Sequence, residues 1–299
     1  MAKYLLISLF CLLFILFLVV KMGKRSADIK LRAPFSGNAA PQKLTILFDL
    51  NGVLVNASSY FLGIHISPRH LTFMWELGPI NFLKYLILAR KSPLALSRAF
   101  YVLLDKVDPT SINSTGTRNN KDLLPGLMCD WLKGTKTGAE IEQMINDYLN
   151  VHEQEFMAIE RLLFRKLAHA LFDAHTYQNL CTVAAQAIEF AAACKARGYR
   201  IGILSNWDPA SFALLQEKNP KLFNLFDEKD IFISGHMHLL KPDPAIYQEV
   251  LKHIDGVILF IDDQHENIEA AQKSGMQTFL FEAYDSADVK QLGKQLRIE

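Results

Sequence analysis

Five short apolar runs constrain the fold of this chain more than any other feature of its sequence. Their β-branched content and their lack of polar alternation are typical of strands that are buried on both faces. Stretches with helical periodicity separate the last four runs, which predicts a doubly wound parallel sheet of the α/β class. The runs are KLTILFD (43–49), YRIGILSN (199–206), DIFISG (230–235), GVILFIDD (256–263) and QTFLFEA (277–283).

A long insertion separates the first two runs. About 150 residues lie between them, whereas one βαβ unit needs about 30. Residues 57–183 show helical periodicity and no convincing strand pattern, so we expect an all-helical insert there. The α/β core is then built from residues 43–56 and 184–299.

The amino terminus has the composition of a membrane segment. Tyr4–Val20 carries no charge, and a helix of this length reaches roughly 25 Å, within the range tolerated for a bilayer span. We therefore predict an N-terminal transmembrane helix within an anchor at residues 1–25, followed by a linker at residues 26–42. Basic residues after the apolar segment favour a cytoplasmic location for the rest of the chain. The alternative is a signal peptide that is cleaved on export.

The overall composition excludes some classes of partner. Lys and Arg total 32 against 31 Asp and Glu, so the chain lacks the basic excess that nucleic-acid binding requires. Four cysteines are scattered without close pairs, which gives no sign of a disulfide framework or a zinc site. The chain is long enough for one large globular domain or two small ones, and we expect a small-molecule substrate.

Polar residues follow the predicted strands at the points where they end. Three separate apolar runs end at Asp49, at Ser205 and at the pair Asp262 and Asp263. Lys241 follows a fourth run after a short loop. The carboxyl ends of parallel strands lie at one edge of a sheet, where ligands bind. Clustered carboxylates provide the oxygen ligands that suit Mg²⁺, and Mg²⁺ in turn binds phosphoryl oxygens. The pattern predicts a magnesium-dependent site for a phosphorylated small molecule.

The segments that carry these residues resemble the four motifs of the haloacid dehalogenase superfamily of hydrolases. They are LFDLNGVL (47–54), ILSN (203–206), LLKPDPAIY (239–247) and LFIDDQHENIEAA (259–271). The resemblance covers about residues 43–56 and 184–285 and implies a Rossmann-like core. It also implies that residues 57–183 occupy the place of that family's helical cap.

The resemblance also implies a role for each site residue. Asp49 is expected to be the nucleophile and a metal ligand, and the backbone carbonyl of Asn51 a second ligand. Asp262 and Asp263 are expected to complete the Mg²⁺ shell, directly or through water. Ser205 is expected to bind the phosphoryl group with help from Asn206, and Lys241 to steady the nucleophile and the transition state. The implied activity is that of a phosphatase acting on a small phosphorylated metabolite.

Asn51 departs from the pattern of the family's phosphatases, which usually carry a second Asp there as a proton donor. An amide donates a hydrogen bond but releases no proton. Three explanations remain open. The protein is a phosphatase that takes its proton elsewhere or uses substrates with good leaving groups, it acts on phosphonates or halides, or it is a membrane-tethered phosphate-binding module with weak turnover.

Overall fold

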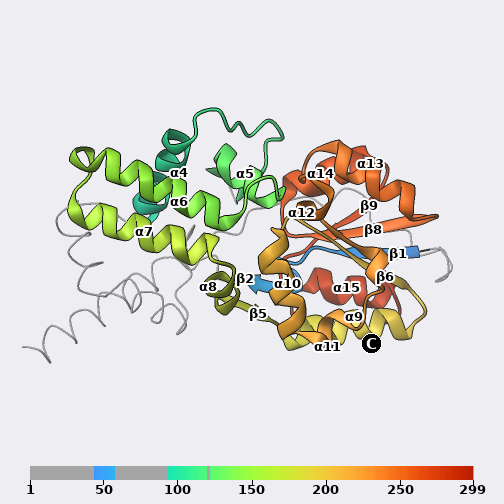
Figure 1. The fold of residues 1–299 in the computed structure, drawn as a ribbon. Helices are drawn as coiled ribbons and strands as arrows, with labels where there is room; N and C mark the ends of the chain where they lie inside the picture. The colour runs from blue at the N-terminus through green and yellow to red at the C-terminus, as the bar shows by residue number, and fades with distance from the viewer. Residues whose placement is uncertain (1–43, 58–92, 120–121, 299) are drawn as a thin grey trace, which may run out of the picture.

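The computed structural model describes residues 44–57, 93–119 and 122–298, and a five-stranded parallel sheet forms its centre (Figure 1). The strand order is β7-β6-β1-β8-β9. All five apolar runs form strands of this sheet, so the predicted α/β class is confirmed. The strands are β1 (Leu44–Phe48), β6 (Arg200–Ser205), β7 (Ile231–Ile233), β8 (Val257–Asp262) and β9 (Gln277–Leu280).

Helices cover both faces of the sheet because side chains of successive strand residues point to opposite faces. In β1, Leu44, Ile46 and Phe48 belong to one apolar cluster, and Leu47 belongs to another. The first cluster includes residues of α9 (Ala185–Ala196), α10 (Pro209–Lys218), α11 (Pro220–Phe223) and α15 (Ala287–Gln295). The second cluster includes residues of α13 (Pro244–His253) and α14 (His265–Lys273).

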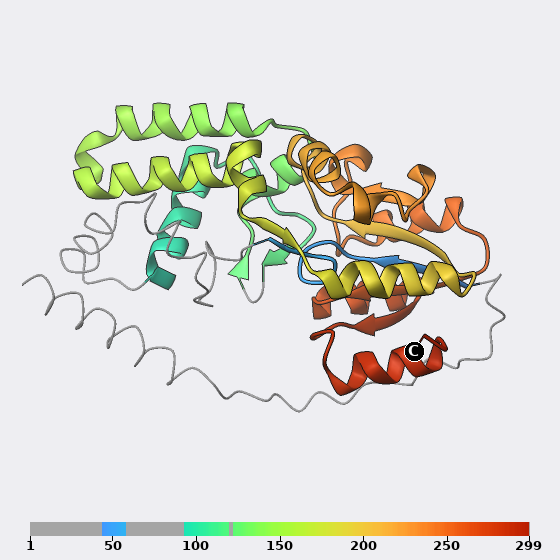
Figure 2. The same ribbon diagram turned by 90° about the horizontal axis from the view of Figure 1, so that it is seen from below.

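The helical insert has an apolar core of its own. Helices α6 and α7 lie side by side as an antiparallel pair (Figure 2). Thr137 and Glu140 form a capping box that begins α6, and the buried side chains of both helices belong to one cluster. The insert's helices are α4 (Pro93–Val107), α5 (Gly126–Leu132), α6 (Gly138–Val151), α7 (Ala158–Phe172) and α8 (Ala174–Asn179), with a 3₁₀ turn, η3, at Glu153–Glu155.

The prediction that the insert is all helical was wrong in detail. Strand β3 (Arg118–Asn119) pairs antiparallel with β4 (Asp122–Leu123). At the base of the insert, β2 (Val55–Ala57) pairs antiparallel with β5 (Cys181–Val183). These strands are two or three residues long, which is too short to show the alternation by which a strand is recognised in a sequence.

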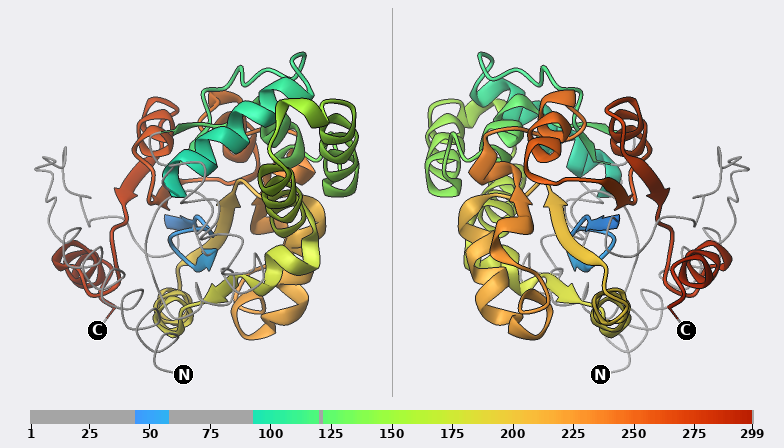
Figure 3. Two further views of the ribbon diagram at one scale, coloured as in Figure 1. Left: turned by 90° about the vertical axis from the view of Figure 1, so that its left-hand side faces the viewer. Right: turned by 90° about the vertical axis from the view of Figure 1, so that its right-hand side faces the viewer.

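The insert lies beside the carboxyl ends of the sheet strands. The two views of Figure 3 look along the long axis of the molecule, so the insert and the core overlap in both. Ser234 begins the short helix α12 (Ser234–Met237), and its Oγ donates to Leu132 O at 2.7 Å. His238 Nδ1 lies 2.7 Å from Lys133 O and donates to it. These bonds join the carboxyl end of α5 in the insert to the segment that follows β7. A 3₁₀ turn, η4 (Glu228–Asp230), precedes β7.

The predicted anchor, residues 1–25, and linker, residues 26–42, lie outside the described residues. Within the described ranges, no helix has both the length and the apolar character needed to span a bilayer.

The junction between insert and core predicts a stability effect. Ser234 is fully buried, accepts a bond from Trp207 N at 2.9 Å and donates to Leu132 O. Ser234→Ala leaves both backbone groups unsatisfied, so the free energy of unfolding should fall by about 1–3 kcal/mol. Urea denaturation measures the change.

Ser274→Ala is the matched control, because Ser274 Oγ only bonds back to Ala270 O in its own helix. That variant should stay within about 0.5 kcal/mol of the wild type. Equal effects of the two substitutions would show that Ser234 does not hold the junction.

Candidate active site

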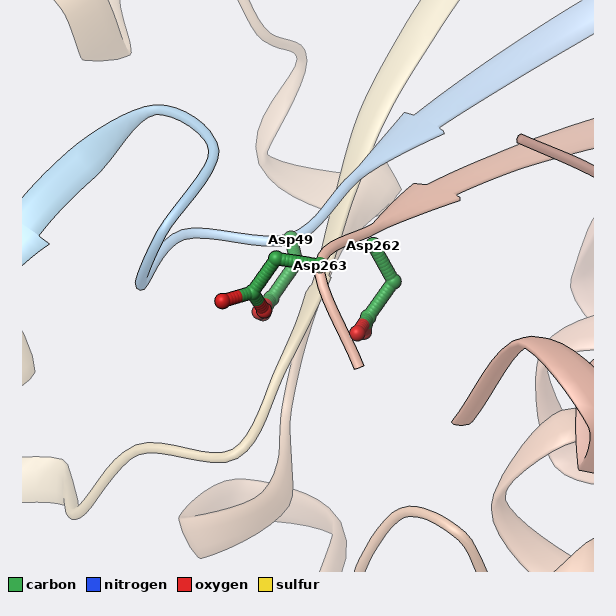
Figure 4. A group of neighbouring side chains, drawn as sticks. All are labelled: Asp49, Asp262 and Asp263. Atoms are coloured by element: carbon green, nitrogen blue, oxygen red, sulfur yellow. The ribbon is translucent and has the colours of Figure 1, made fainter. Parts of the chain in front are cut away.

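Asp49 occupies the point where the central strand β1 ends. Its backbone N–H donates to Ile261 O of β8 at 2.9 Å, which extends the sheet pairing by one residue. The side chain is only 4 % exposed, and it lies beside the carboxylates of Asp262 and Asp263 (Figure 4). A buried acid at this position needs a partner charge, since an isolated carboxylate is strongly disfavoured away from water.

Lys241 provides that charge. Its side chain is 1 % exposed, and its Nζ lies 2.8 Å from Asp49 Oδ1 and 2.7 Å from Asp262 Oδ2. A third contact, to Leu204 O at 3.1 Å, satisfies the ammonium further. Burial alone lowers the pKa of Lys241, but the charges of Asp262 and Asp49 outweigh it and hold the pKa above its ordinary value. The lysine is therefore a permanent cation between two acids.

The three carboxylates form one cluster with surplus negative charge. One oxygen from each of Asp49, Asp262 and Asp263 lies within 4.8 Å of the others. Burial raises the pKa of Asp49 to about 6, with Lys241 opposing and Asp262 adding to the shift. The pKa of Asp263 rises to about 8, first through lost hydration and then through the charges of Asp49 and Asp262. Asp263 is nevertheless open to solvent, so a cation can reach the cluster from that side.

Gly52 shapes the loop that faces this cluster. Its φ of +86° is a conformation that side chains disfavour. A Cβ there would lie 2.2 Å from Asp263 Oδ2, so only glycine lets the backbone after Asn51 approach the carboxylate so closely. The loop closes on itself through a bond from Gly52 N to Val55 O at 2.8 Å.

Two buried oxygens at the site have no hydrogen bond within the described residues. Asp49 Oδ1 is in ion-pair contact with Lys241 but receives no well-directed hydrogen bond. Ser205 Oγ lies near enough to Asp49 to lower its pKa but makes no hydrogen bond of good geometry. Ser205 is 1 % exposed and ends β6, next to β1. Unsatisfied buried polar atoms are uncommon and mark positions where a ligand or ion binds. Together with the three clustered carboxylates and the glycine cradle, they suit a divalent cation and an anion.

The structure places the Asn206 side chain on the backbone of Lys241. Asn206 Nδ2 donates to Lys241 O, and Lys241 N donates to Asn206 Oδ1, both at 2.9 Å. Both polar atoms of the amide are therefore used in positioning the lysine. The expected help in binding the phosphoryl group stays a prediction.

Two residues that the sequence analysis did not single out complete the arrangement. Asn267 Nδ2 lies 3.0 and 3.1 Å from the two oxygens of Asp262 and fixes that carboxylate. Thr117 Oγ1, from the insert, donates to Lys241 O at 2.9 Å. An amide in the first turn of the helix after the acid pair was a usable signal for Asn267. Thr117 lies 124 residues from Lys241 and has no such signal.

The buried position of Lys241 predicts a large effect on stability. Lys241→Met leaves Asp49 and Asp262 buried without their counter-charge, so the free energy of unfolding should fall by about 3–5 kcal/mol. Chemical denaturation at neutral pH measures it. Lys252→Met is the control, because Lys252 is 69 % exposed in its pair with Glu249, and it should change stability by less than about 1 kcal/mol. A tolerated Lys241→Met would contradict the ion-pair geometry.

Curated relatives match a part of this chain. A sesquiterpene phosphatase, astK, of Aspergillus oryzae is 36% identical over 85 residues, which are 27% of this chain and 42% of the relative. A drimenol cyclase, drtB, of Aspergillus calidoustus is 36% identical over 89 residues, which are 29% of this chain and 16% of the relative. The chain thus spans less than half of the length of either protein.

Solved structures share the fold. A HAD family enzyme of Bacteroides thetaiotaomicron is 18% identical, with a TM-score of 0.51, and the match covers 83% of this chain and 97% of that one. A second structure of that enzyme, in complex with magnesium and inorganic phosphate, is 16% identical with a TM-score of 0.48, over 82% and 98% of the two chains. The hydrolase family described as haloacid dehalogenase-like hydrolase matches residues 44–275. This chain therefore belongs to the haloacid dehalogenase-like hydrolase family, as the resemblance of its four motifs implied.

Proposed function

We propose that the protein is a Mg²⁺-dependent phosphatase that forms an aspartyl-phosphate on Asp49. The observation that carries the proposal is the buried Asp49 carboxylate, in contact with Lys241 and within one cluster with Asp262 and Asp263. A carboxylate that is held as an anion but makes few directed hydrogen bonds is available as a nucleophile.

The ion would be held by the side chains of Asp49, Asp262 and Asp263 and by the backbone carbonyl of Asn51. Mg²⁺ bound there would neutralise the phosphoryl oxygens and lower the repulsion between them and the carboxylates. Burial is the largest cause of the raised pKa values of Asp49 and Asp263, and the charges of neighbouring carboxylates add to both shifts.

The remaining roles follow from the positions of the chain's own groups. One Asp49 oxygen attacks phosphorus, and the ester oxygen leaves with the bonding electrons. Ser205 Oγ, which is buried beside Asp49, donates to a phosphoryl oxygen. Lys241 stabilises the negative charge of the transition state, and water then attacks phosphorus to release phosphate and restore the carboxylate.

The substrate that we propose is a small phosphorylated metabolite. One curated relative is named as a sesquiterpene phosphatase, which supports a terpenyl phosphate as the first substrate to examine. The intact acidic cluster argues against dehalogenation, because a halide displacement needs no divalent cation. If the protein hydrolyses no phosphate ester, the explanation that remains is a phosphate-binding module with weak turnover.

Asn51 predicts which phosphates are hydrolysed. General acid help contributes about 10²- to 10⁴-fold, so the wild type should favour aryl or acyl phosphates, whose leaving groups need no proton. Asn51→Asp should accelerate alkyl phosphates within that range, and Asp49→Asn should abolish Mg²⁺-dependent release from both classes. Phosphate release by the full-length chain is the measurement. An Asn51→Asp variant that is no faster on alkyl phosphates would show that the proton is not limiting.

We also propose that Tyr4–Val20 anchors the enzyme in a membrane with its catalytic part in the cytoplasm. The proposal is supported by the uncharged apolar segment and by the basic residues that follow it. The full-length chain should stay in the membrane fraction after alkaline carbonate extraction, and a carboxyl-terminal reporter should be active on the cytoplasmic side. Release of a shortened chain would instead indicate a cleaved signal peptide.

A further inference from the structure

The backbone of Lys241 is held by side chains. Asp49 and Asp262 lie at strand ends, where sheet pairing fixes their backbone, but Lys241 lies in the turn between α12 and α13. Within the described residues, its N–H donates to Asn206 Oδ1, and its carbonyl accepts from Asn206 Nδ2 and from Thr117 Oγ1, each at 2.9 Å. The position of the lysine backbone therefore depends on one side chain of the core and one of the insert.

A loop of the insert fixes Thr117 against this carbonyl. Thr117 is buried. Its N–H donates to Asn113 Oδ1 at 3.2 Å, and its carbonyl accepts from Asn113 Nδ2 at 2.8 Å and from Leu124 N at 3.0 Å. Asn113 Nδ2 also donates to Leu124 O at 2.9 Å, and Leu124 belongs to the apolar cluster of the insert. The Thr117 hydroxyl is therefore fixed relative to the core of the insert.

Two further bonds join the insert to the segment that leads to Lys241. Ser234 Oγ donates to Leu132 O, and His238 Nδ1 donates to Lys133 O, both at 2.7 Å. Ser234 begins this segment directly after β7, and Lys241 ends it before α13. The insert therefore contacts the segment at its start, at His238 and at Lys241 itself. The sheet and the insert together set the position of this segment.

The ammonium at the other end of the Lys241 side chain tolerates little displacement. Its Nζ has carboxylate oxygens at 2.8 and 2.7 Å and the carbonyl oxygen of Leu204 at 3.1 Å. It also lies 5.2 Å from the centroid of the Phe260 ring. A shift of the lysine backbone lengthens these contacts, and a misplacement of about 1 Å can lower a catalysed rate about 10²-fold.

We infer that Thr117 is a positioning residue for the proposed reaction. Through its bond to the carbonyl of Lys241, the insert sets the position of the lysine ammonium relative to Asp49. The inference rests on the proposed phosphatase function and deepens it. In this role Thr117 acts through Lys241 and contacts no substrate atom. Loss of its hydroxyl should therefore weaken the stabilisation of the transition state and leave substrate binding in place.

Thr117→Val removes the hydroxyl and keeps the shape of the side chain. With the full-length chain in detergent, phenyl phosphate and Mg²⁺, kcat should fall roughly 5- to 50-fold while KM stays within about twofold of the wild type. That split between kcat and KM indicates an interaction that is made in the transition state. Thr117→Ser keeps the hydroxyl, so its kcat should stay within about threefold of the wild type.

Inhibition constants supply a readout apart from kcat. Vanadate adopts the five-coordinate geometry of the transition state, whereas inorganic phosphate has the geometry of the product. Thr117→Val should raise the inhibition constant of vanadate about tenfold and leave that of inorganic phosphate within about twofold.

Thr135→Val is the matched control, because Thr135 also lies in the insert and its Oγ1 donates to a backbone carbonyl, that of Asp130, at 2.9 Å. Its kcat and both inhibition constants should stay within about twofold of the wild type. All rates are measured at a temperature at which thermal melts show each variant to be folded. If Thr117→Val does not fold there, Thr117→Ala is the second variant, with the same expected results.

The outcomes separate the two proposals. If the wild type hydrolyses phenyl phosphate and folded Thr117→Val has an unchanged kcat, the inference is overturned and the phosphatase function stays in place. A raised KM with unchanged kcat also overturns it, because Thr117 would then serve substrate binding. An equal loss in Thr135→Val does so too, since the effect would belong to the insert as a whole. If the wild type releases no phosphate from phenyl phosphate, the proposed function fails and the inference fails with it.

Discussion

The buried ion pair between Lys241 and the acids Asp49 and Asp262 is the constraint on which the rest of the site depends. An ammonium and two carboxylates are all nearly inaccessible to solvent, an arrangement that persists only with close geometry and additional hydrogen bonds. Those bonds come from three directions: Leu204 O bonds to the ammonium, Asn267 to Asp262, and the Asn206 and Thr117 side chains to the lysine backbone. Residues of the sheet, of α14 and of the insert therefore all bond to residues of this ion pair.

This convergence explains how a core and an insert with separate apolar clusters can form one site. The core places Asp49 at the end of its central strand. The insert contacts Lys241 through Thr117, and it contacts the segment after β7 through Leu132 and Lys133. We propose that the insert selects the substrate, because its Thr117 contacts the backbone of Lys241. The chemistry belongs to the core, where the same parallel sheet brings the acids of β1 and β8 side by side.

Much of this architecture could be predicted from sequence, and the reasons are physical. Buried parallel strands are continuous apolar runs, so all five were visible. Polar residues at the ends of three runs, and Lys241 after a fourth, marked the site edge. Asn206 shows the limit: its amide bonds to the Lys241 backbone, a contact that the sequence does not indicate. Contacts such as that of Thr117 depend on how the insert packs, and the two- and three-residue strands of the insert have no periodicity to detect. The roles expected for Asn51 and Ser205 stay predictions that chemistry must test.

The central claim is that the Asp49 carboxylate becomes covalently phosphorylated. The most direct measurement is to quench the full-length enzyme with acid during turnover of phenyl phosphate with Mg²⁺, reduce it with borohydride and map the peptides by mass spectrometry. The account predicts conversion of Asp49 to homoserine, dependent on both substrate and Mg²⁺, with Asp262 and Asp263 unchanged. Turnover without modification of Asp49, or modification of another acid in its place, would contradict the account.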